Sequence, residues 1–406
     1  MPGMNGTVRP LAGHHGLDKV GFVASAVGLA SLVGLPFATV RHSRIATGVS
    51  VSAYAGLPRT WFALAIAAWL AVVALSFVRE RRVAATARGL LGAGIIGALL
   101  VLSGWAATHL AQGVGRFARV SIGGGVWLSA IAGYTLVLSS RRQIGPRTAA
   151  GRAVTWLAPL GVAAILASGV LVDLGIMKEY RNVADRFWVE ALNTVVFAAV
   201  AVVIATVIGV WLGVAAYRTP RFERPVFAVV SVFQTIPGLA MVGLLVAPLA
   251  AISFAVPVLR RLGIGGIGWA PVVIALTLYA LLAIVRNTHA GLRGVPRAVV
   301  DAGRGMGMTD EQLLRKVEVP LGMPVVFSGV RTSAVQTIGN ATLGAFVGGI
   351  TLGRFIFQGL AEQAPDLTML GSIALVAIAL VVDAVLRRVQ DTAFARRPTP
   401  ADGSLS

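Results

Sequence analysis

The stretch VVDAGRGMGMTDEQLLRKVEVPLGMP (Val299–Pro324) is a polar insert in a chain that is otherwise dominated by long apolar runs. It holds four acidic and three basic residues in 26 positions, whereas the 406-residue chain as a whole is 56% hydrophobic and 13% charged. A soluble domain carries about 25% charged residues. The composition therefore predicts an integral membrane protein whose insert lies outside the bilayer.

The insert carries start and stop signals for two short helices. Pro296 suits the first turn of a helix, and Gly305–Gly307 favours the left-handed turn that ends it. Thr309 and Gln312 form a capping-box pattern for a second helix, which Pro320 is expected to end. The pattern indicates either two amphipathic helices lying on lipid headgroups or a docking element for a cytoplasmic partner.

Several classes of protein do not fit this chain. It has no cysteine, which excludes disulfides and thiolate metal sites, and its five histidines lack metal-ligand spacing. The net charge of +19 comes from basic residues spread over short loops, which argues against nucleic-acid binding. No G-x-x-x-x-G-K-[ST] motif occurs, so the chain is not expected to hydrolyse ATP with a P-loop.

A spanning helix needs roughly 20 mostly apolar residues, and the sequence offers ten candidates. They are Val20–Val40, Thr60–Val78, Leu90–Leu110, Ser121–Leu138, Ala153–Leu174, Val189–Tyr217, Val226–Ile252, Trp269–His289, Met323–Gly348 and Leu367–Leu386. The fourth candidate is interrupted by Gly123–Gly125, which indicates a flexible break or a reentrant element. With ten spans both termini lie on the same side of the membrane.

The distribution of basic residues predicts the orientation. Of the 35 Lys and Arg residues, 23 fall in segments that share a side with the termini, and 11 fall on the opposite side. The remaining one, Arg331, lies inside a predicted span. Because cytoplasmic loops are enriched in Lys and Arg, both termini and the polar insert are expected to be cytoplasmic.

A polar segment in the middle of the chain, Val172–Glu190, is expected to be an outer connector at a domain boundary. The sequence is accordingly divided into an N-terminal membrane extension (residues 1–175), a second membrane domain (residues 176–390) and a polar tail (residues 391–406). The insert lies in a cytoplasmic loop of the second domain, residues 291–322.

The run DAGRGMG, nine further residues and then VEVP resembles the signature loop of ABC-importer permeases. That signature reads E-A-A, three residues, Gly, nine residues and I-x-L-P. Here Asp301, Ala302 and Gly303 stand at the E-A-A positions, Gly307 is the glycine, and Val317–Pro320 is the end. At two of these positions the chain departs from the signature, because aspartate replaces glutamate and glycine replaces the second alanine.

In that family the loop forms a coupling helix seated in a cleft of the ATPase subunit. The resemblance therefore implies that this segment couples the chain to an ATPase. The residues concerned are Asp301, Ala302, Gly303, Arg304, Gly305, Met306, Gly307 and Met308.

Further runs resemble permeases for glycine betaine, choline and related osmoprotectants. They are FQTIPGLAMVGLL (Phe233–Leu245), LYALLAIVRNTHAGLRGVP (Leu278–Pro296), RGMGM (Arg304–Met308) and GRFIFQGL (Gly353–Leu360). In the first half, ARVSIGGGVWLS (Ala118–Ser129) and IMKEY (Ile176–Tyr180) resemble the YehY-type permeases, which carry a long membrane N-terminal extension.

The resemblance implies an all-α integral membrane protein. Its type I ABC importer permease core has about five spans, preceded by about five extra N-terminal spans, in the inner membrane of a bacterial cell. The implied function is that of a non-enzymatic permease subunit for osmoprotectants such as glycine betaine. A separate ATPase would bind ATP and Mg, an extracytoplasmic binding protein would deliver the substrate, and a second permease copy or a shorter sister permease would complete the channel. No cofactor is expected on this chain.

Polar residues interrupt the second span of the core at Gln234, Thr235 and Pro237. Proline removes a backbone hydrogen bond and kinks a helix. Two interpretations stay open: these side chains line the translocation path, or they form a kink with a hydroxyl that bonds back to the preceding turn.

The fourth span of the core also has a polar character. Thr332, Gln336 and Asn340 share one helical face, which would meet either neighbouring helices or the translocation path. Arg331 and Asp383 are the ionisable residues within predicted spans of the core. We expect Asp383 to pair with Arg387 four residues later, and Arg331 to have either a structural role or a place in the path.

Alternative functions remain open at this point. The chain could be an ABC permease for another small solute such as an amino acid, or a self-sufficient secondary transporter or channel. The scarcity of acidic residues in mid-membrane counts against gradient-driven transport. A non-transporting scaffold would leave the polar insert unexplained.

Overall fold

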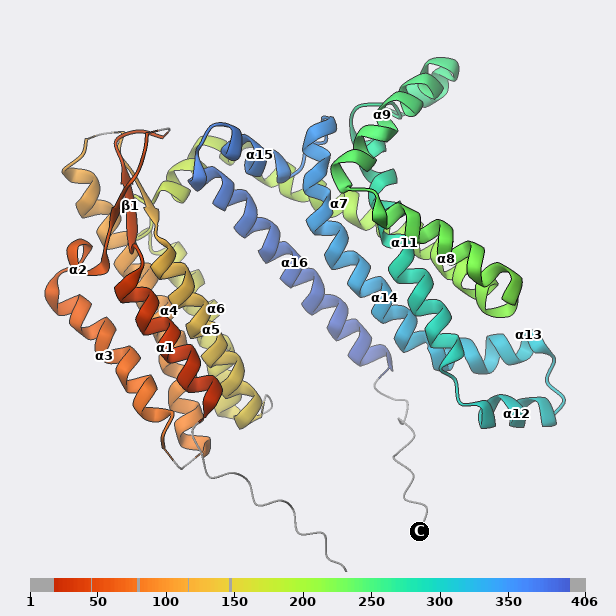
Figure 1. Ribbon diagram of the computed structural model, residues 1–406, viewed down its shortest axis with the longest axis horizontal. Helices are drawn as coiled ribbons and strands as arrows, with labels where there is room; N and C mark the ends of the chain where they lie inside the picture. Colours follow the sequence, from red (N-terminus) through yellow and green to blue (C-terminus); the bar gives the residue numbers. More distant parts are fainter. Residues whose placement is uncertain (1–17, 45, 79–80, 116, 146–147, 395–406) are drawn as a thin grey trace, which may run out of the picture. The chain divides into compact units, whose positions relative to one another are not determined.

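The computed structural model describes residues 18–44, 46–78, 81–115, 117–145 and 148–394. The chain forms two compact units, residues 1–181 and 182–406 (Figure 1). Helices dominate both units, which confirms the predicted helical class. Of the predicted polar tail, residues 395–406 lie outside the described residues.

The N-terminal unit combines apolar helices with a small sheet. Its elements are α1 (Lys19–Gly34), β1 (Ala38–Arg41), β2 (Val49–Val51), α2 (Ala53–Gly56), α3 (Arg59–Leu75), α4 (Arg81–Gln112), β3 (Arg119–Ile122), α5 (Gly124–Ile144) and α6 (Ala149–Ala167). The sheet is antiparallel with the order β2-β1-β3, and Ala38 lies opposite both Val51 and Ile122.

This sheet was not predicted, and it corrects two of the expected spans. The span expected at Val20–Val40 ends as a helix at Gly34, because Leu35 is extended and Pro36 has no N–H to continue the helix. The span expected at Ser121–Leu138 begins as strand β3. The backbone N–H of Gly123 donates to the carbonyl of Phe37 at 2.8 Å, so the glycine run is a junction between strand and helix.

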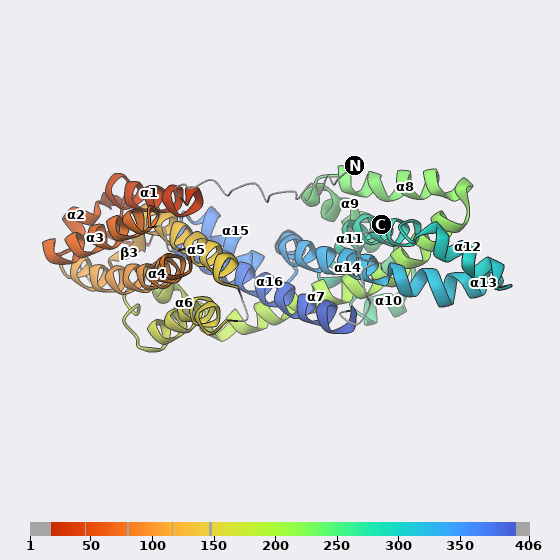
Figure 2. The same ribbon diagram turned by 90° about the horizontal axis from the view of Figure 1, so that it is seen from below.

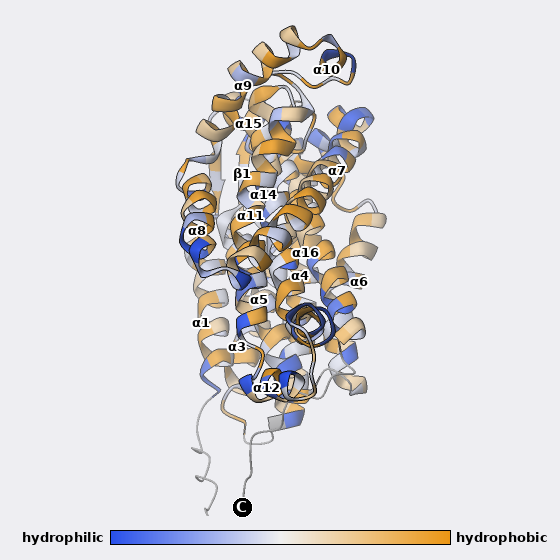
Figure 3. Cartoon of the chain, turned by 90° about the vertical axis from the view of Figure 1, so that its right-hand side faces the viewer, coloured by the Kyte–Doolittle hydropathy of each residue, from blue (hydrophilic) through white to orange (hydrophobic). Residues whose placement is uncertain are grey.

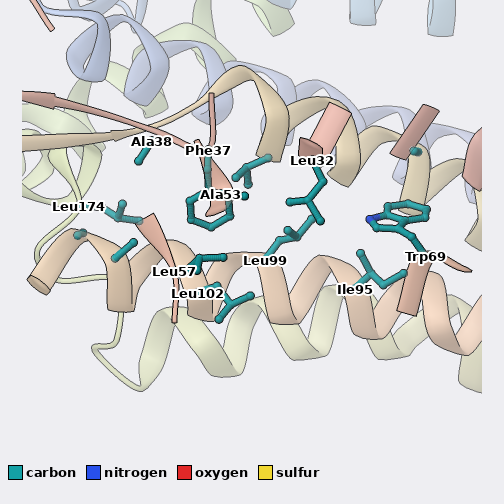
Figure 4. Close-up of a cluster of buried hydrophobic side chains, with 14 of the residues drawn as sticks. Leu32, Phe37, Ala38, Ala53, Leu57, Trp69, Ile95, Leu99, Leu102 and Leu174 are labelled. Atoms are coloured by element: carbon teal, nitrogen blue, oxygen red, sulfur yellow. The ribbon is translucent and has the colours of Figure 1, made fainter. Parts of the chain in front are cut away.

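The core of this unit is filled by buried apolar side chains from α1, α3 and α4 together with the sheet (Figure 4). Trp69 is fully buried beside α1, and a Cβ on Gly28 would overlap its ring. At one end of the unit, Asp18 accepts hydrogen bonds from the side chain of Gln143 (2.9 Å) and pairs with Arg88 (2.8 Å). The Arg88 side chain is only 5% exposed. Together, Asp18 at the start of α1, Arg88 on α4 and Gln143 on α5 join three helices.

The polar connector expected at Val172–Glu190 is mostly helical. Helix α7 (Gly175–Arg218) runs without interruption for 44 residues, which is about 66 Å at 1.5 Å per residue. Near its beginning, the buried carboxylate of Glu179 lies 2.9 Å from Arg44 and 3.8 Å from Arg119. The charge of Glu179, in the segment that suggested a loop, is therefore neutralised on a helix. Its partners are Arg44, in the loop after β1, and Arg119, in β3.

The second unit contains the rest of α7 and the following elements. They are α8 (Pro220–Thr235), α9 (Gly238–Ala255), α10 (Pro257–Arg261), α11 (Trp269–Arg293), α12 (Arg297–Gly305), α13 (Asp310–Leu313), the π-helix η1 (Leu314–Glu318), α14 (Val319–Asn340), the 3-10 helix η2 (Ala341–Val347), α15 (Gly353–Ala361) and α16 (Pro365–Phe394).

Helices α11 and α14 lie side by side in Figures 1 and 2 and approach each other at glycines. A Cβ on Gly322 would lie 2.8 Å from the carbonyl oxygen of Gly291, and the reverse distance is also 2.8 Å. A Cβ on Gly329 would lie 2.5 Å from the Cβ of Asn287. Small residues let membrane helices pack backbone to backbone, so these glycines set the spacing of the pair.

Pro320 does not end the second helix of the insert, contrary to the prediction. The helix passes from α13 through η1 into α14. The N–H of Val319 donates to the carbonyl of Leu314, five residues earlier, which is the pattern of a π turn. A π turn is wider than an α turn, so it leaves room for a proline ring that would otherwise collide with a backbone carbonyl.

The predicted number of ten spans is not confirmed. By length and composition, six helices of the described residues could cross a membrane: α4, α6, α7, α9, α11 and α16. Helices α1 and α3 are apolar but shorter. The span expected at Val226–Ile252 is fully broken at Ile236–Pro237 into α8 and α9, so the expected kink is a complete interruption.

Candidate functional site

The polar insert folds as two helices joined by a glycine turn, as predicted. Gly307 has a φ of +79°, a backbone conformation that favours glycine. The Gln312 N–H donates to the Thr309 hydroxyl at 3.3 Å, and the Thr309 N–H donates to the Gln312 side chain at 3.0 Å. The predicted capping box is therefore confirmed. We call residues 297–313, with α12 and α13, the hairpin.

Gly303 explains one departure from the permease signature. It is buried, and a Cβ at this position would lie 2.7 Å from Cδ1 of Leu313, which is itself 2% exposed. The absence of a side chain lets α12 close onto α13. The glycine therefore replaces alanine at a point where the two helices touch, not at the exposed face.

Most residues of the hairpin are exposed, and hydrophilic and hydrophobic residues alternate along it (Figure 3). Between residues 301 and 308, only Gly303 is buried and Met308 partly buried. The Arg304 guanidinium lies 4.0 Å from the carboxylate of Asp301 and 3.9 Å from that of Asp310. Beside these charges the Met306 side chain is 72% exposed.

The composition of this segment distinguishes the two interpretations of the insert. Residues 297–318 hold four basic and four acidic residues and no aromatic residue. A helix that lies on a membrane surface is usually rich in Lys and Arg and carries large apolar side chains on its other face. The balanced charge and the exposed methionine favour contact with a protein partner instead.

The break between α8 and α9 is held against α11. The Gln234 side chain donates to the Tyr279 carbonyl at 3.0 Å, and the Tyr279 hydroxyl donates to the Ile236 carbonyl at 2.5 Å. The Thr235 hydroxyl donates to Val232 at 2.8 Å, which is the back-bonding of the alternative interpretation. Pro237 is the N-cap of α9. Despite these bonds, Gln234 and Thr235 are exposed. Their exposure is compatible with the interpretation that they line the translocation path.

The polar face of α14 points away from its neighbours in this chain. Thr332 and Gln336 are exposed and Asn340 is half-buried. On the adjacent face of the helix Ser333 is buried and donates to the Ala280 carbonyl on α11 at 3.2 Å. Because Ala280 follows Tyr279 on α11, the break after α8 and helix α14 meet the same turn of α11.

Arg331 is engaged in an ion-pair network between α14 and α16. Its guanidinium lies 2.6 Å from the carboxylate of Asp383, which also lies 2.9 Å from Arg387. The predicted pair between Asp383 and Arg387 is confirmed. The contact with Asp383 favours the structural role for Arg331.

The buried carboxylates of Glu190 and Glu318 were not recognised in the sequence. Glu190 on α7 is fully buried and lies 3.6 Å from the Arg354 guanidinium on α15. Glu318 in η1 accepts a hydrogen bond from the Tyr217 hydroxyl at 2.8 Å. Each partner is more than 100 residues away in the sequence, and no local spacing could indicate it. Within the described residues no group of three or more His, Asp or Glu could hold a metal ion.

Six helices long and apolar enough to cross a membrane, together with an exposed hairpin between α11 and α14, define a multi-pass helical membrane protein. The chain belongs to the family described as "Binding-protein-dependent transport system inner membrane component", whose sequence model matches residues 205–397. A second model, the N-terminal domain of the ABC transporter permease YehY, matches residues 18–177. The predicted resemblance to ABC importer permeases of the YehY type is confirmed, and the chain is a membrane permease subunit rather than an ATPase.

Several relatives match about half of the chain. The carnitine transport permease OpuCB of Listeria monocytogenes is 40% identical over 190 residues, which cover 47% of this chain and 80% of that protein. The choline transport permease OpuBB of Bacillus subtilis is 35% identical over 207 residues, 51% of this chain and 86% of that one. The osmoprotectant import permease OsmW of Salmonella typhimurium is 38% identical over 192 residues, 47% and 84% respectively.

A solved structure of the inward-facing MetNI methionine ABC transporter is similar over 52% of this chain and 97% of its own, with 22% identity and a TM-score of 0.45.

Proposed function

We propose that this chain is the membrane permease of an ATP-driven importer for osmoprotectants such as glycine betaine. The names of the three relatives, which are permeases for carnitine, choline and osmoprotectants, support this substrate class. The observation that supports ATP-driven coupling is the exposed, charge-balanced hairpin, because a chain without a P-loop needs a partner that hydrolyses ATP.

The proposed organisation follows the division made from the sequence. Residues 1–175 form a membrane extension, residues 176–390 the permease core and residues 391–406 a polar tail. Both termini and the hairpin face the cytoplasm. Asp301–Met308 docks onto the ATPase subunit, which binds ATP and Mg, and an extracytoplasmic binding protein delivers the substrate to the opposite side.

The exposed face of α14, with Thr332, Gln336 and Asn340, is proposed to face the translocation path at the boundary with a second permease, either another copy or a shorter sister chain. Polar groups exposed from a membrane helix are costly in lipid, and the adjacent face of α14, with Ser333, is already packed on α11. Gln234, Thr235 and Pro237 lie at the break that contacts Tyr279 of α11, the residue before Ala280, and we propose that they lie beside the same path.

The test of substrate and coupling is reconstitution in liposomes. The chain is purified in mild detergent with the ATPase and binding protein that accompany it, and uptake of radiolabelled glycine betaine is measured with and without ATP. ATP-dependent uptake that choline or carnitine inhibits is expected. Uptake of an amino acid in preference to betaine would overturn the substrate class, and gradient-driven uptake by the chain alone would overturn ATP coupling.

The test of the docking role exchanges Asp301–Met308 for a Gly/Ser linker of the same length. The chain should insert and accumulate normally, but the ATPase should no longer copurify and uptake should be lost. The matched control exchanges Pro257–Arg261, the exposed helix α10 beyond the other end of α11. Unimpaired uptake after the first exchange would contradict docking through the hairpin.

A further inference from the structure

The hairpin is joined to the membrane part of the core through the π turn η1. Residues Leu314–Glu318 form this turn between α13 and α14, immediately before Pro320. π turns are rare and occur frequently at functional sites. The hairpin is joined to α11 at its beginning, through residues 294–296, and to α14 at its end, through η1. Because η1 lies in the continuous helix that leads from α13 into α14, a tilt of the hairpin relative to α14 bends the chain at this turn.

The last residue of η1 carries a buried carboxylate. Glu318 is 6% exposed, and a buried carboxylate is costly unless it is hydrogen-bonded. In the described part of the chain, its hydrogen-bond partner is the Tyr217 hydroxyl, which donates at 2.8 Å. Tyr217 is the second-last residue of α7, so this bond joins the π turn to the end of the long helix α7.

Tyr217 lies where several helices of the core meet. Its ring packs edge-on against the ring of His289 on α11, with centroids 6.4 Å apart, and His289 also contacts Phe227 on α8. Glu223 on α8 lies 3.6 Å from His289. The phenol ring is therefore held by packing, and its hydroxyl is left to bond the π turn.

We propose that Tyr217 is a positioning residue for coupling. Its hydrogen bond to Glu318 holds the π turn, and with it the angle of the hairpin, against the end of α7. The inference rests on the docking function proposed for the hairpin. When the hairpin is moved by the ATPase, this bond passes the movement to α7; without it the hairpin still docks, but its movement is absorbed in the π turn.

The test is Tyr217→Phe, which removes the hydroxyl and keeps the ring. In the reconstituted transporter, the amount of copurified ATPase should stay unchanged, while glycine betaine transported per ATP hydrolysed should fall about fivefold or more. Glu318→Ala should give the same loss. Glu318→Gln should restore the ratio, because an amide oxygen also accepts a hydrogen bond. The double variant Tyr217→Phe/Glu318→Ala should be no worse than either single variant.

Tyr134→Phe is the matched control, because Tyr134 is 52% exposed on α5, and it should leave the ratio unchanged. An unchanged ratio in Tyr217→Phe would overturn the proposal, and so would a parallel fall of transport and hydrolysis. Failure of hairpin docking is distinguishable, because it would appear as undiminished ATPase copurification after exchange of Asp301–Met308.

Discussion

The contact between Gly291 and Gly322 allows one perturbation to be worked out in detail. A Cβ on Gly322 would lie 2.8 Å from the carbonyl oxygen of Gly291, whereas ordinary contact begins at 3.4 Å. In Gly322→Ala, helices α11 and α14 must therefore separate by about 0.6 Å at this point, the difference between these two distances. The obstacle is backbone, which cannot turn aside as a side chain can, and overpacking of this kind costs about 1–3 kcal/mol.

The substitution also has a favourable effect, which the control must isolate. Replacing glycine by alanine in a helix stabilises by about 0.4–1 kcal/mol through the unfolded chain. Gly339, on the same helix α14, has no atom within 4 Å of the position where a Cβ would be. Gly339→Ala should show the favourable effect alone, so the two variants should differ by about 1–3 kcal/mol.

The assay is thermal unfolding of each purified variant in the same detergent, monitored by tryptophan fluorescence. Uptake is measured in parallel. Gly322→Ala should unfold at a lower temperature than Gly339→Ala and transport more slowly. Equal stability of the two variants would refute close glycine packing between α11 and α14.

Two further predictions concern ion pairs. Asp383→Asn leaves Arg331 without its carboxylate and should destabilise the chain by about 1–3 kcal/mol, measured by thermal unfolding; the double variant Arg331→Met/Asp383→Leu should recover most of this loss. For Asp18, burial acts to raise the pKa, but hydrogen bonds from Gln143 and Gly21 and the charge of Arg88 outweigh it and hold the pKa below its ordinary value of 3.8. The pair therefore stabilises the folded chain above about pH 4, and its contribution is lost as the pH falls below that value. Unfolding measured from pH 7 to pH 3 should show wild type losing its advantage over Asp18→Asn; a constant difference would contradict the pairing.

Features that depend on neighbours in sequence could be predicted. The capping box joins Thr309 to Gln312, and the turn depends on Gly307 alone, so both are visible in the insert itself. The pair of Asp383 and Arg387 is four residues apart on one helix. The class of protein followed from apolar content and from the signature loop.

Features that depend on distant partners could not be predicted. The sheet pairs Thr39 with Ser121, and its strands are too short to leave a pattern that differs from the end of an apolar helix. The connector after Val172 was polar enough to suggest a loop, because Arg44 and Arg119, which neutralise Glu179, lie far away in sequence. The bond between Tyr217 and Glu318 is hidden for the same reason.

Pro320 shows how a correct local rule can give a wrong boundary. Proline ends an isolated α-helix because its ring meets the carbonyl four residues earlier. The chain avoids this collision by widening the preceding turn, and the buried contacts of Leu314 and Glu318 stabilise that wider turn. The local sequence shows the proline that would end a helix, whereas the wider turn that accommodates it depends on tertiary packing.

The π turn also explains why the spacing between the glycine and the end of the signature loop matters. A π turn contains one residue more than the α turn that it replaces, and each residue of an α-helix advances about 1.5 Å and rotates about 100°. The number of residues between Gly307 and Val317, which is nine, therefore determines how the hairpin is rotated about the axis of α14. Removing one residue from Leu314–Glu318 would turn α13 by about 100° relative to α14, and it would restore the collision at Pro320 that the wider turn avoids.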